Sequence, residues 1–337
     1  MAHKWLKEIR EGEWIKGVYL VKEKALNTTK KGLPYLVLIL ADKTAEKEAR
    51  VWENAKEVSG AVEKGDLVEV EGEVTSFREQ TQIKVQKIKR FEGSVDYSRY
   101  IETSPQDPSS MVTSLIKILN QIENPHLSAL VNRFLSDQDF LEKFKQAPAA
   151  KNFHHNYVGG LLEHTLGVCK LAGAVARLYP HLDKDLLLAG AFLHDIGKVR
   201  ELSWDLAVDY TDEGRLLGHL ILGVMMLEQK LIKLKTFPQD MATRLKHLIL
   251  SHHGEFEFGS PKRPKFLEAF ALHFIDDVDA KMNGIARFME KDTSEGAWTG
   301  FNRMFERFFL KGRISDEMDM GEDEAQDQGS QPSLFSL

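Results

Sequence analysis

Histidine and acidic residues interrupt several segments of this sequence that are otherwise apolar. In FLHDIGK, His194 and Asp195 end the apolar run LLLAGAFL. The same feature recurs at His164 in GGLLEHTLGV, His219 in GHLILG, His252 and His253 in LILSHHG, and Asp276 in HFIDDVDAK. One buried histidine is more often a hydrogen-bonded core residue than a ligand, but five such segments favour a common site. Because a divalent cation offsets the cost of burying an ionised carboxylate, these residue types predict a shared metal centre.

A helix end is expected at His194 and Asp195. Adjacent residues on a regular helix point about 100° apart, so both side chains can face one site only where the helix stops. Gly197 predicts that stop, because glycine readily adopts the left-handed conformation that caps helices.

A β-rich region precedes the elements that must position these residues. From Trp14 to about Phe91, apolar and polar residues alternate with the period of two that is typical of strands. Five segments show this alternation, and NAKEVSGAVEKG between the third and fourth can hold a short helix. The pattern predicts a five-stranded barrel of the OB type over residues 1–92, with other small barrels as alternatives.

The rest of the chain divides into three parts. Residues 93–110 lose periodicity and gain Pro and Ser, which predicts a linker. Residues 111–313 show amphipathic helical patterns throughout, so we expect an all-α bundle. Residues 314–337 contain seven acidic residues and no Lys or Arg, which predicts a disordered acidic tail.

Length and composition set further limits. A chain of 337 residues with 42% apolar residues can form two domains. Without its acidic tail, the chain of net charge −6 is close to neutral, so its folded part does not strongly repel a polyanion. The polar N-terminus and the lack of an apolar run of about 18 residues predict a cytoplasmic protein without a membrane partner. The only cysteine, Cys169, is expected to pack in the core.

The pattern of site residues in this sequence resembles that of a known protein family. His164, His194-Asp195 and Asp276 form the H…HD…D pattern of the HD superfamily of metal-dependent phosphohydrolases, and Lys198 completes its HDxGK form. The segments FHHNYVGGLLEHT, AGAFLHDIGK, SHHGEFEFGSPKRP and LHFIDDVDAKMN resemble the YhaM group, 3′→5′ exoribonucleases that join an N-terminal OB domain to an HD domain. The resemblance covers most of the chain, through about Met304.

The resemblance implies a site with two divalent ions. Manganese is the first expectation, with Fe, Co, Zn or Mg as alternatives. The residues that match ligands of the first ion are His164, His194, Asp195 and Asp276, with Asp195 as a bridge. His219 and His252 match ligands of the second ion, and His253 matches either a ligand or a phosphate contact. The catalytic residues implied are Asp195, Lys198, which would face the scissile phosphate, and His253.

Several nearby residues have open roles. His253, His155 or water could protonate the departing 3′ oxygen. Asp277 stands where the family usually has Asn, and we interpret it as solvated. Asp279 shares a helical face with Asp276, so it could orient a ligand or form a surface salt bridge. His154 and His155 could line the substrate entrance, or could instead pack against the helix that follows.

Contacts to single-stranded nucleic acid are expected on the barrel. OB folds stack bases on aromatic rings within a basic groove. The candidates are Lys30, Tyr35, Arg50 and Lys84, although barrel aromatics are often core and strand lysines often only solvated. Trp52 we interpret as a packing residue.

The C-terminal residues QPSLF resemble the Q-x-[SD]-L-F peptide by which bacterial replication and repair proteins dock on the sliding clamp. Gln331, Leu334 and Phe335 would be its contact residues, and the alternative is a frayed terminus.

The function that these observations favour is metal-dependent 3′→5′ hydrolysis of single-stranded RNA to nucleoside 5′-monophosphates, with DNA as a further substrate. One alternative is a phosphohydrolase of nucleotides or cyclic nucleotides, although HHGEFEFGSP lacks the HHExxDGxGYP pattern of the cyclic-di-GMP branch. Others are a clamp-recruited replication or repair nuclease, and a binding module with structural metals. The sequence leaves open the metal, the oligomeric state and the choice between RNA and DNA.

Overall fold

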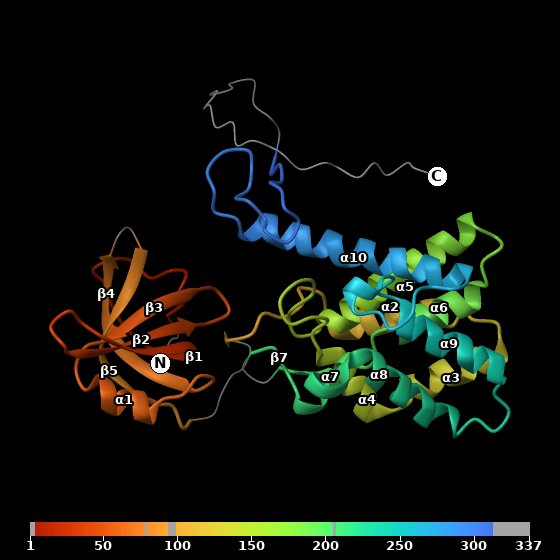
Figure 1. The fold of residues 1–337 in the computed structure, drawn as a ribbon, viewed down its shortest axis with the longest axis horizontal. Coiled ribbons are helices and arrows are strands. Elements are labelled where there is room, and N and C mark those ends of the chain that lie inside the picture. The colour runs from red at the N-terminus through yellow and green to blue at the C-terminus, as the bar shows by residue number, and fades with distance from the viewer. Residues whose placement is uncertain (1–3, 78–79, 94–98, 205–206, 313–337) are drawn as a thin grey trace. The chain divides into compact units, whose positions relative to one another are not determined.

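The computed structural model describes residues 4–77, 80–93, 99–204 and 207–312 (Figure 1). Its first part is a β-barrel and the remainder is helical. By packing, the chain separates into two units, Met1–Gly284 and Ile285–Leu337. Among the described residues, no helix is both long enough and apolar enough to cross a lipid bilayer.

The barrel has the five strands that the alternation predicts. They are β1 (Trp14–Thr28), β2 (Pro34–Ala41), β3 (Glu46–Val51), β4 (Leu67–Phe77) and β5 (Gln80–Arg90), with α1 (Ala55–Ala61) between β3 and β4. The sheet closes in the order β1-β2-β3-β5-β4, and only the β3–β5 pair is parallel. On β2, Leu36, Leu38 and Leu40 point into the core because successive strand residues face opposite sides. The OB-type barrel is therefore confirmed.

The helical part begins with α2. Its helices are α2 (Pro108–Leu119), α3 (Pro125–Leu135), α4 (Gln138–Gln146), α5 (Gly160–Leu178), α6 (Lys184–Leu193), α7 (Lys198–Glu201), α8 (Asp212–Leu231), α9 (Gln239–Ser251) and α10 (Leu267–Lys291). A short ribbon, β6 (Leu202–Ser203) with β7 (Asp209–Tyr210), precedes α8, and the 3₁₀ turn η2 (Phe256–Phe258) follows α9. The expected helical bundle is therefore confirmed.

Capping side chains set where several helices begin. Five side chains accept hydrogen bonds from backbone N–H groups of the first turn: Asp107, Asn124, Asp137, Asp183 and Thr211. The helical pattern LSALVNRFLSDQDFLEKF runs without a break through Asp137, but the structure starts a new helix there, because its carboxylate binds the N–H of Phe140.

Helix α6 lies at the centre of the helical core. Its residues Leu186–Leu193 are all buried, as expected for a helix that is apolar on every side. The Phe192 ring contacts Phe134 and Phe144 edge to face. Cys169 is buried in the same core, so its predicted packing role is confirmed. This packing fixes the C-terminal end of α6, where His194 and Asp195 follow.

Candidate metal centre

The turn after α6 places His194 and Asp195 side by side. The helix ends at Leu193, as predicted, but Gly197 is not in a left-handed conformation, since its φ is −63°. The prediction that Gly197 ends the helix by adopting a left-handed conformation was therefore wrong. A Cβ on Gly197 would lie 2.0 Å from the carbonyl oxygen of His219. Glycine is required because the turn packs directly against the backbone of α8.

Four side chains form the first cluster, and they come from α5, the turn after α6, and α10. His164 Nε2 lies 3.0 Å from Asp276 Oδ1 and 3.2 Å from His194 Nε2. The Oδ2 atom of Asp195 lies 3.6 Å and 3.4 Å from the same two nitrogens. Ligands about 2.0–2.2 Å from one ion are separated by distances of this size. The cluster therefore has the dimensions of a single metal site.

The other oxygen of Asp195 belongs to a second cluster. Asp195 Oδ1 lies 3.5 Å from His219 Nε2 and 3.5 Å from His252 Nε2. His253 completes this cluster, with its Nε2 3.2 Å from that of His219. The carboxylate of Asp195 thus presents one oxygen to each cluster.

Two buried atoms of the second cluster lack hydrogen-bond partners. Within the described residues, Asp195 Oδ1 and His252 Nε2 are among the few buried side-chain polar atoms without one. Such atoms are costly to bury unless something else satisfies them. A cation between them would do so. The donor set, imidazole nitrogens and carboxylate oxygens, suits a divalent metal, and several triads of these residues could hold one.

Each imidazole is oriented through its Nδ1 atom. His164 donates from Nδ1 to Asp279 at 2.7 Å, and His219 donates to Glu201 at 2.9 Å. The remaining three donate to backbone carbonyl oxygens: His194 to Ala191, His252 to Ile249, and His253 to Phe258. In the neutral, metal-binding form of each ring, Nδ1 carries the proton and Nε2 faces the clusters with its lone pair.

Glu201 was missed by sequence analysis. It is buried in α7, and its Oε1 accepts hydrogen bonds from both Nδ1 and the backbone N–H of His219. That N–H is free because α8 is kinked at Gly218, whose φ of 70° is not helical. The sequence signal that could have identified Glu201 is that it is an acidic residue three positions after Lys198. For Asp279, the structure supports the alternative in which it orients a ligand.

The charges of the site complement one another without a metal. Burial favours the neutral carboxyl, but Lys198 and His194 hold the pKa of Asp195 well below its ordinary value. Lys198 is buried, with Nζ 2.6 Å from Asp195 Oδ2. Burial opposes protonation of His194, yet Asp195 and Asp276 raise its pKa to about 10. A proton therefore occupies the first cluster in the absence of a cation.

In the second cluster, by contrast, burial disfavours protonation of two histidines. Burial lowers the pKa of His252, and it lowers the pKa of His253 to about 2. Both imidazoles are therefore neutral at neutral pH, which is the state that binds metals.

His154 and His155 differ in their surroundings. His155 is buried, with Nδ1 2.9 Å from the Tyr157 hydroxyl and Nε2 3.0 Å from Asp279 Oδ2. This geometry corresponds to the packing alternative, because neither ring nitrogen is free. In contrast, the buried Nδ1 of His154 has no hydrogen-bond partner among the described residues, and its ring lies 5.1 Å from that of His164. Asp277 lies on the outside of α10 and pairs with Lys281 at 2.7 Å.

Comparison with known proteins agrees with this site. Residues 161–281, which contain all the residues of both clusters, match the HD domain family, and residues 13–90 match the OB-fold nucleic acid binding domain family. The chain is 37% identical over 282 residues to the 3′-5′ exoribonuclease YhaM of Bacillus subtilis (strain 168), covering 83% of this chain and 89% of that relative. The chain belongs to the YhaM family of 3′-5′ exoribonucleases.

Further YhaM relatives support the assignment. The YhaM protein of Geobacillus sp. (strain WCH70) is 37% identical, with 83% of this chain and 86% of that relative covered. That of Shouchella clausii (strain KSM-K16) is 35% identical, with 86% and 90% covered. The resemblance inferred from the sequence is thus confirmed, and the chain is a 3′-5′ exonuclease with an HD domain.

The OB barrel of this YhaM-family chain carries an exposed aromatic pair. Tyr35 on β2 stacks on Trp52, with ring centroids 4.9 Å apart and planes 19° apart. Trp52 is 44% exposed, so it packs on Tyr35 at the surface of the barrel and not in its core. The residue follows the end of β3, where the chain leaves the barrel wall. Its ring therefore lies on the outside of the barrel.

Basic residues lie on the same barrel. Arg50 and Lys84 are register partners on the adjacent strands β3 and β5. Arg50 also pairs with Glu48 at 2.6 Å, whereas Lys84 is exposed. Lys30 is exposed in the turn between β1 and β2.

The predicted acidic tail and the residues Gln331, Leu334 and Phe335 lie outside the described residues.

Proposed function

We propose that this YhaM-family chain removes nucleotides from the 3′ end of single-stranded RNA with two divalent ions, and releases nucleoside 5′-monophosphates. The observation that carries the proposal is Asp195, which presents one carboxylate oxygen to each of two ligand clusters. Two clusters that share one buried carboxylate suit a pair of closely spaced ions, the arrangement that phosphodiester-cleaving enzymes with two metals use.

The geometry of the two clusters supports a division of the ligands between two ions. His164, His194, Asp195 and Asp276 would hold the first ion, and Asp195, His219, His252 and His253 the second. When bound, the ions would activate water and stabilise the charge that develops on the phosphate and the leaving oxygen. We propose manganese, with Fe, Co, Zn and Mg as alternatives that this nitrogen and oxygen donor set also accepts.

We propose that Lys198 and His154 contact the substrate phosphate. Lys198 carries a buried positive charge beside Asp195, and a phosphodiester is an anion that such a charge attracts. His154 is the histidine next to the first cluster with an unpartnered ring nitrogen. Burial and the charge of Lys198 lower its pKa well below the ordinary value, so it would act as a neutral hydrogen-bond donor. His253 is better suited to the second ion than to proton transfer, since its Nε2 faces His219.

The barrel would hold the single strand. Bases can stack on the Tyr35–Trp52 pair while Arg50, Lys84 and Lys30 contact the backbone. A tethered OB fold raises the local concentration of nucleic acid around the HD domain, which favours strands over free nucleotides. This argues against the alternative substrates, free and cyclic nucleotides.

The test uses two adjacent acids with different surroundings. RNA and DNA of the same sequence, labelled at the 5′ end, are incubated with Mn²⁺ or with EDTA. We expect a ladder that shortens from the 3′ end only with Mn²⁺, and faster for RNA. Asp276→Asn should abolish it, whereas Asp277→Asn, in an exposed pair with Lys281, should retain it. Intact RNA with the wild-type protein would reject the proposal, and faster cleavage of DNA would reject the RNA preference.

We also propose that the peptide Gln331–Phe335 docks on the bacterial sliding clamp, with Leu334 and Phe335 as anchors. The support is its match to the docking pattern and its place after an acidic stretch. Pulldown with purified clamp should lose binding when both anchors are changed to alanine; unchanged capture would reject the proposal. A cytoplasmic location remains a prediction.

A further inference from the structure

Helix α10 exposes an apolar stripe on the face opposite the metal centre. The stripe consists of Leu267, Phe270, Phe274, Val278 and Met282, whose side chains are 47–61% exposed. Their spacing of three or four residues places them on one side of the helix over about 24 Å. Asp276 follows Phe274 by two residues and so points to the other side, toward the first cluster.

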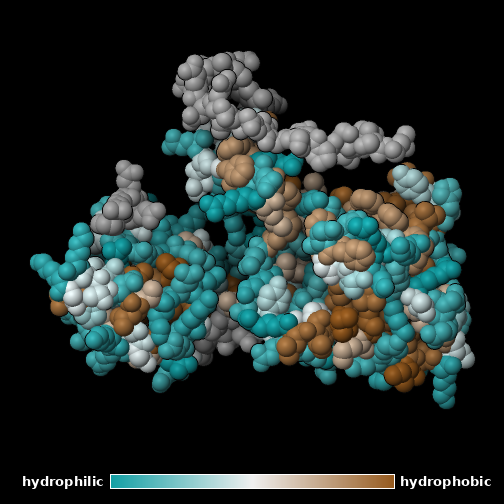
Figure 2. All heavy atoms as spheres, viewed as in Figure 1, coloured by the Kyte–Doolittle hydropathy of each residue, from teal (hydrophilic) through white to brown (hydrophobic). Residues whose placement is uncertain are grey.

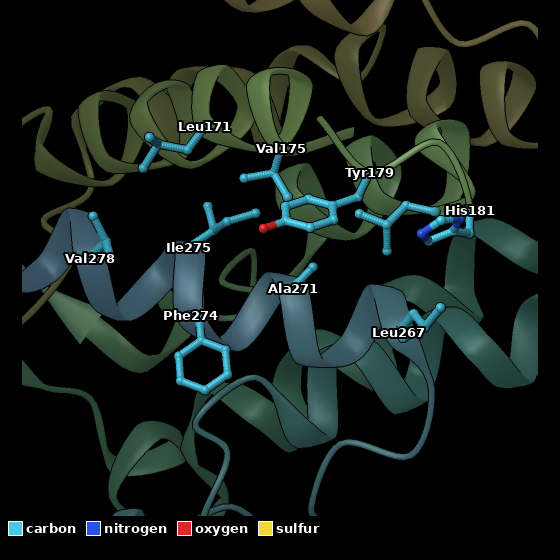
Figure 3. A pocket seen from close by; sticks show the side chains of 10 residues that line it. Leu171, Val175, Tyr179, His181, Leu267, Ala271, Phe274, Ile275 and Val278 are labelled. Atoms are coloured by element: carbon cyan, nitrogen blue, oxygen red, sulfur yellow. The ribbon is translucent and has the colours of Figure 1, made fainter. Parts of the chain in front are cut away.

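An apolar groove runs beside the stripe. Its volume is about 410 Å³, and it lies between α5 and α10. Figure 3 shows Leu171 and Val175 of α5 pointing toward Ala271 and Ile275 of α10, with the Tyr179 ring beside them. Figure 2 shows hydrophobic residues gathered on the surface of the helical part. The lining side chains are almost all apolar, so the groove does not suit a phosphate or a nucleic acid strand.

The order of residues in the stripe is nearly symmetric about Phe274. Phe270 and Val278 each lie four residues from it, and Leu267 and Met282 lie seven and eight residues from it. If two copies of α10 pack antiparallel with their two-fold axis at Phe274, the two apolar stripes face each other. Phe274 then meets its own copy, Phe270 meets Val278, and Leu267 lies within one residue of Met282. Isologous dimers require such a self-complementary patch.

The exposed area is sufficient for a dimer. A whole large apolar side chain presents roughly 200 Å², so five half-exposed side chains leave about 500 Å². Leu178 and Tyr179 at the end of α5, also more than half exposed, raise this to about 700 Å². Standard interfaces bury about 800 Å² per partner. An apolar patch of this size is rarely left uncovered in a monomer.

From these observations we propose that the chain forms a homodimer through antiparallel packing of α10 against α10, with the α5–α10 groove taking up the partner's stripe. Lys281 follows Phe274 by seven residues and so lies on the same side of α10, where it pairs with Asp277 at 2.7 Å. The stripe faces away from both ligand clusters, so the interface leaves the metal centre open. The proposal does not rest on the proposed substrate or metals.

The first test is the molar mass of the full-length protein at tens of micromolar, measured by light scattering. We expect a mass of at least two chains of 38.4 kDa, and half that mass for Phe274→Glu. The matched control is Ile232→Glu, which also places a charge on an exposed apolar residue, 79% exposed after α8, and should not change the mass. Because Phe274 is 59% exposed, its replacement should not unfold the chain, which circular dichroism checks.

The second test fixes the register with single cysteines. The only native cysteine, Cys169, is fully buried. Residue 274 lies on the proposed axis, so Phe274→Cys should form a covalent dimer under mild oxidation. Met282→Cys would lie about 24 Å from its own copy and should remain uncrosslinked.

Three results would overturn the proposal. They are a wild-type monomer, a Phe274→Glu variant of unchanged mass, and crosslinking of Met282→Cys in preference to Phe274→Cys. A monomer that dimerises only after Leu334 and Phe335 are replaced by alanine would assign the groove to the chain's own C-terminus, and would also contradict the homodimer.

Discussion

Asp279 accepts a 2.7 Å hydrogen bond from Nδ1 of His164 and so leaves Nε2 of that ring free to face the first ligand cluster. Asp279 does not belong to the cluster itself. Its contribution is to fix the tautomer and the orientation of an imidazole that is fully buried. Glu201 has the same relationship to His219 in the second cluster. Each cluster therefore has one ligand oriented by a carboxylate.

The first prediction concerns Asp279. Asp279→Asn should weaken binding of the first ion and lower exonuclease activity by about 10–100-fold, the usual effect of removing a partner that orients a metal ligand. An amide can present its NH₂ group to Nδ1 and so favour the wrong tautomer. Calorimetric titration with Mn²⁺ measures the effect. Glu201→Gln should instead weaken binding of the second ion. If both variants lost the same affinity for both ions, separate roles for Asp279 and Glu201 would be contradicted.

The second prediction concerns pH. The folded-state pKa of His194 is raised to about 10, so the metal-free site holds a proton at neutral pH that a cation must displace. Metal affinity should therefore rise as pH increases from 6 to 8, with release of protons on binding. The same proton stabilises the metal-free fold below the unfolded pKa of about 6.5, and that contribution is lost as pH rises toward 10. Calorimetry in buffers of different ionisation enthalpy counts the protons, and zero release at pH 7 would contradict this electrostatic account.

The third prediction concerns Gly197. A methyl group there would lie 2.0 Å from the His219 carbonyl oxygen, so Gly197→Ala should destabilise the fold by about 1–3 kcal/mol. Gly173→Ala on α5 is the matched control, since the nearest other atom to its Cβ would be 4.0 Å away. This control should be neutral or stabilising by about 0.5–1 kcal/mol. Thermal unfolding compares the two, and equal melting temperatures would show that the turn can move away from α8.

The fourth prediction concerns the barrel. Removing the ring of Trp52 should weaken binding of single-stranded RNA by about 1–3 kcal/mol, the usual contribution of one stacked base. Trp14 on β1 is 60% exposed, and Trp14→Ala provides the control. Fluorescence anisotropy with labelled RNA, without metal so that no cleavage occurs, measures both affinities. Equal losses in the two variants would remove the Tyr35–Trp52 pair as a specific binding surface.

The sequence predicted the features that depend on local pattern. Strand alternation predicted the barrel, because burial of every second residue follows from the strand itself. The apolar setting of His164, His194 and Asp276 identified the side chains that α5, the α6 turn and α10 bring together. In each case the residue type and its neighbours carried the information.

The features that were missed depend on contacts between distant segments. Gly197 is needed because His219, twenty-two residues later, brings its carbonyl oxygen against it. Glu201 orients His219 only because α8 is kinked at Gly218. The exposure of Trp52 depends on how the chain leaves β3. No local sequence pattern encodes these contacts between distant segments.

The central claim is that Asp195 bridges two divalent ions. Anomalous diffraction from crystals grown with Mn²⁺ tests it most directly, because it locates each ion independently of activity. We predict two peaks about 3.5–4 Å apart, one between Asp195 and the pair His164 and Asp276, the other between Asp195 and His219 with His252. A single peak at full occupancy, or two peaks of which only one contacts Asp195, would contradict it.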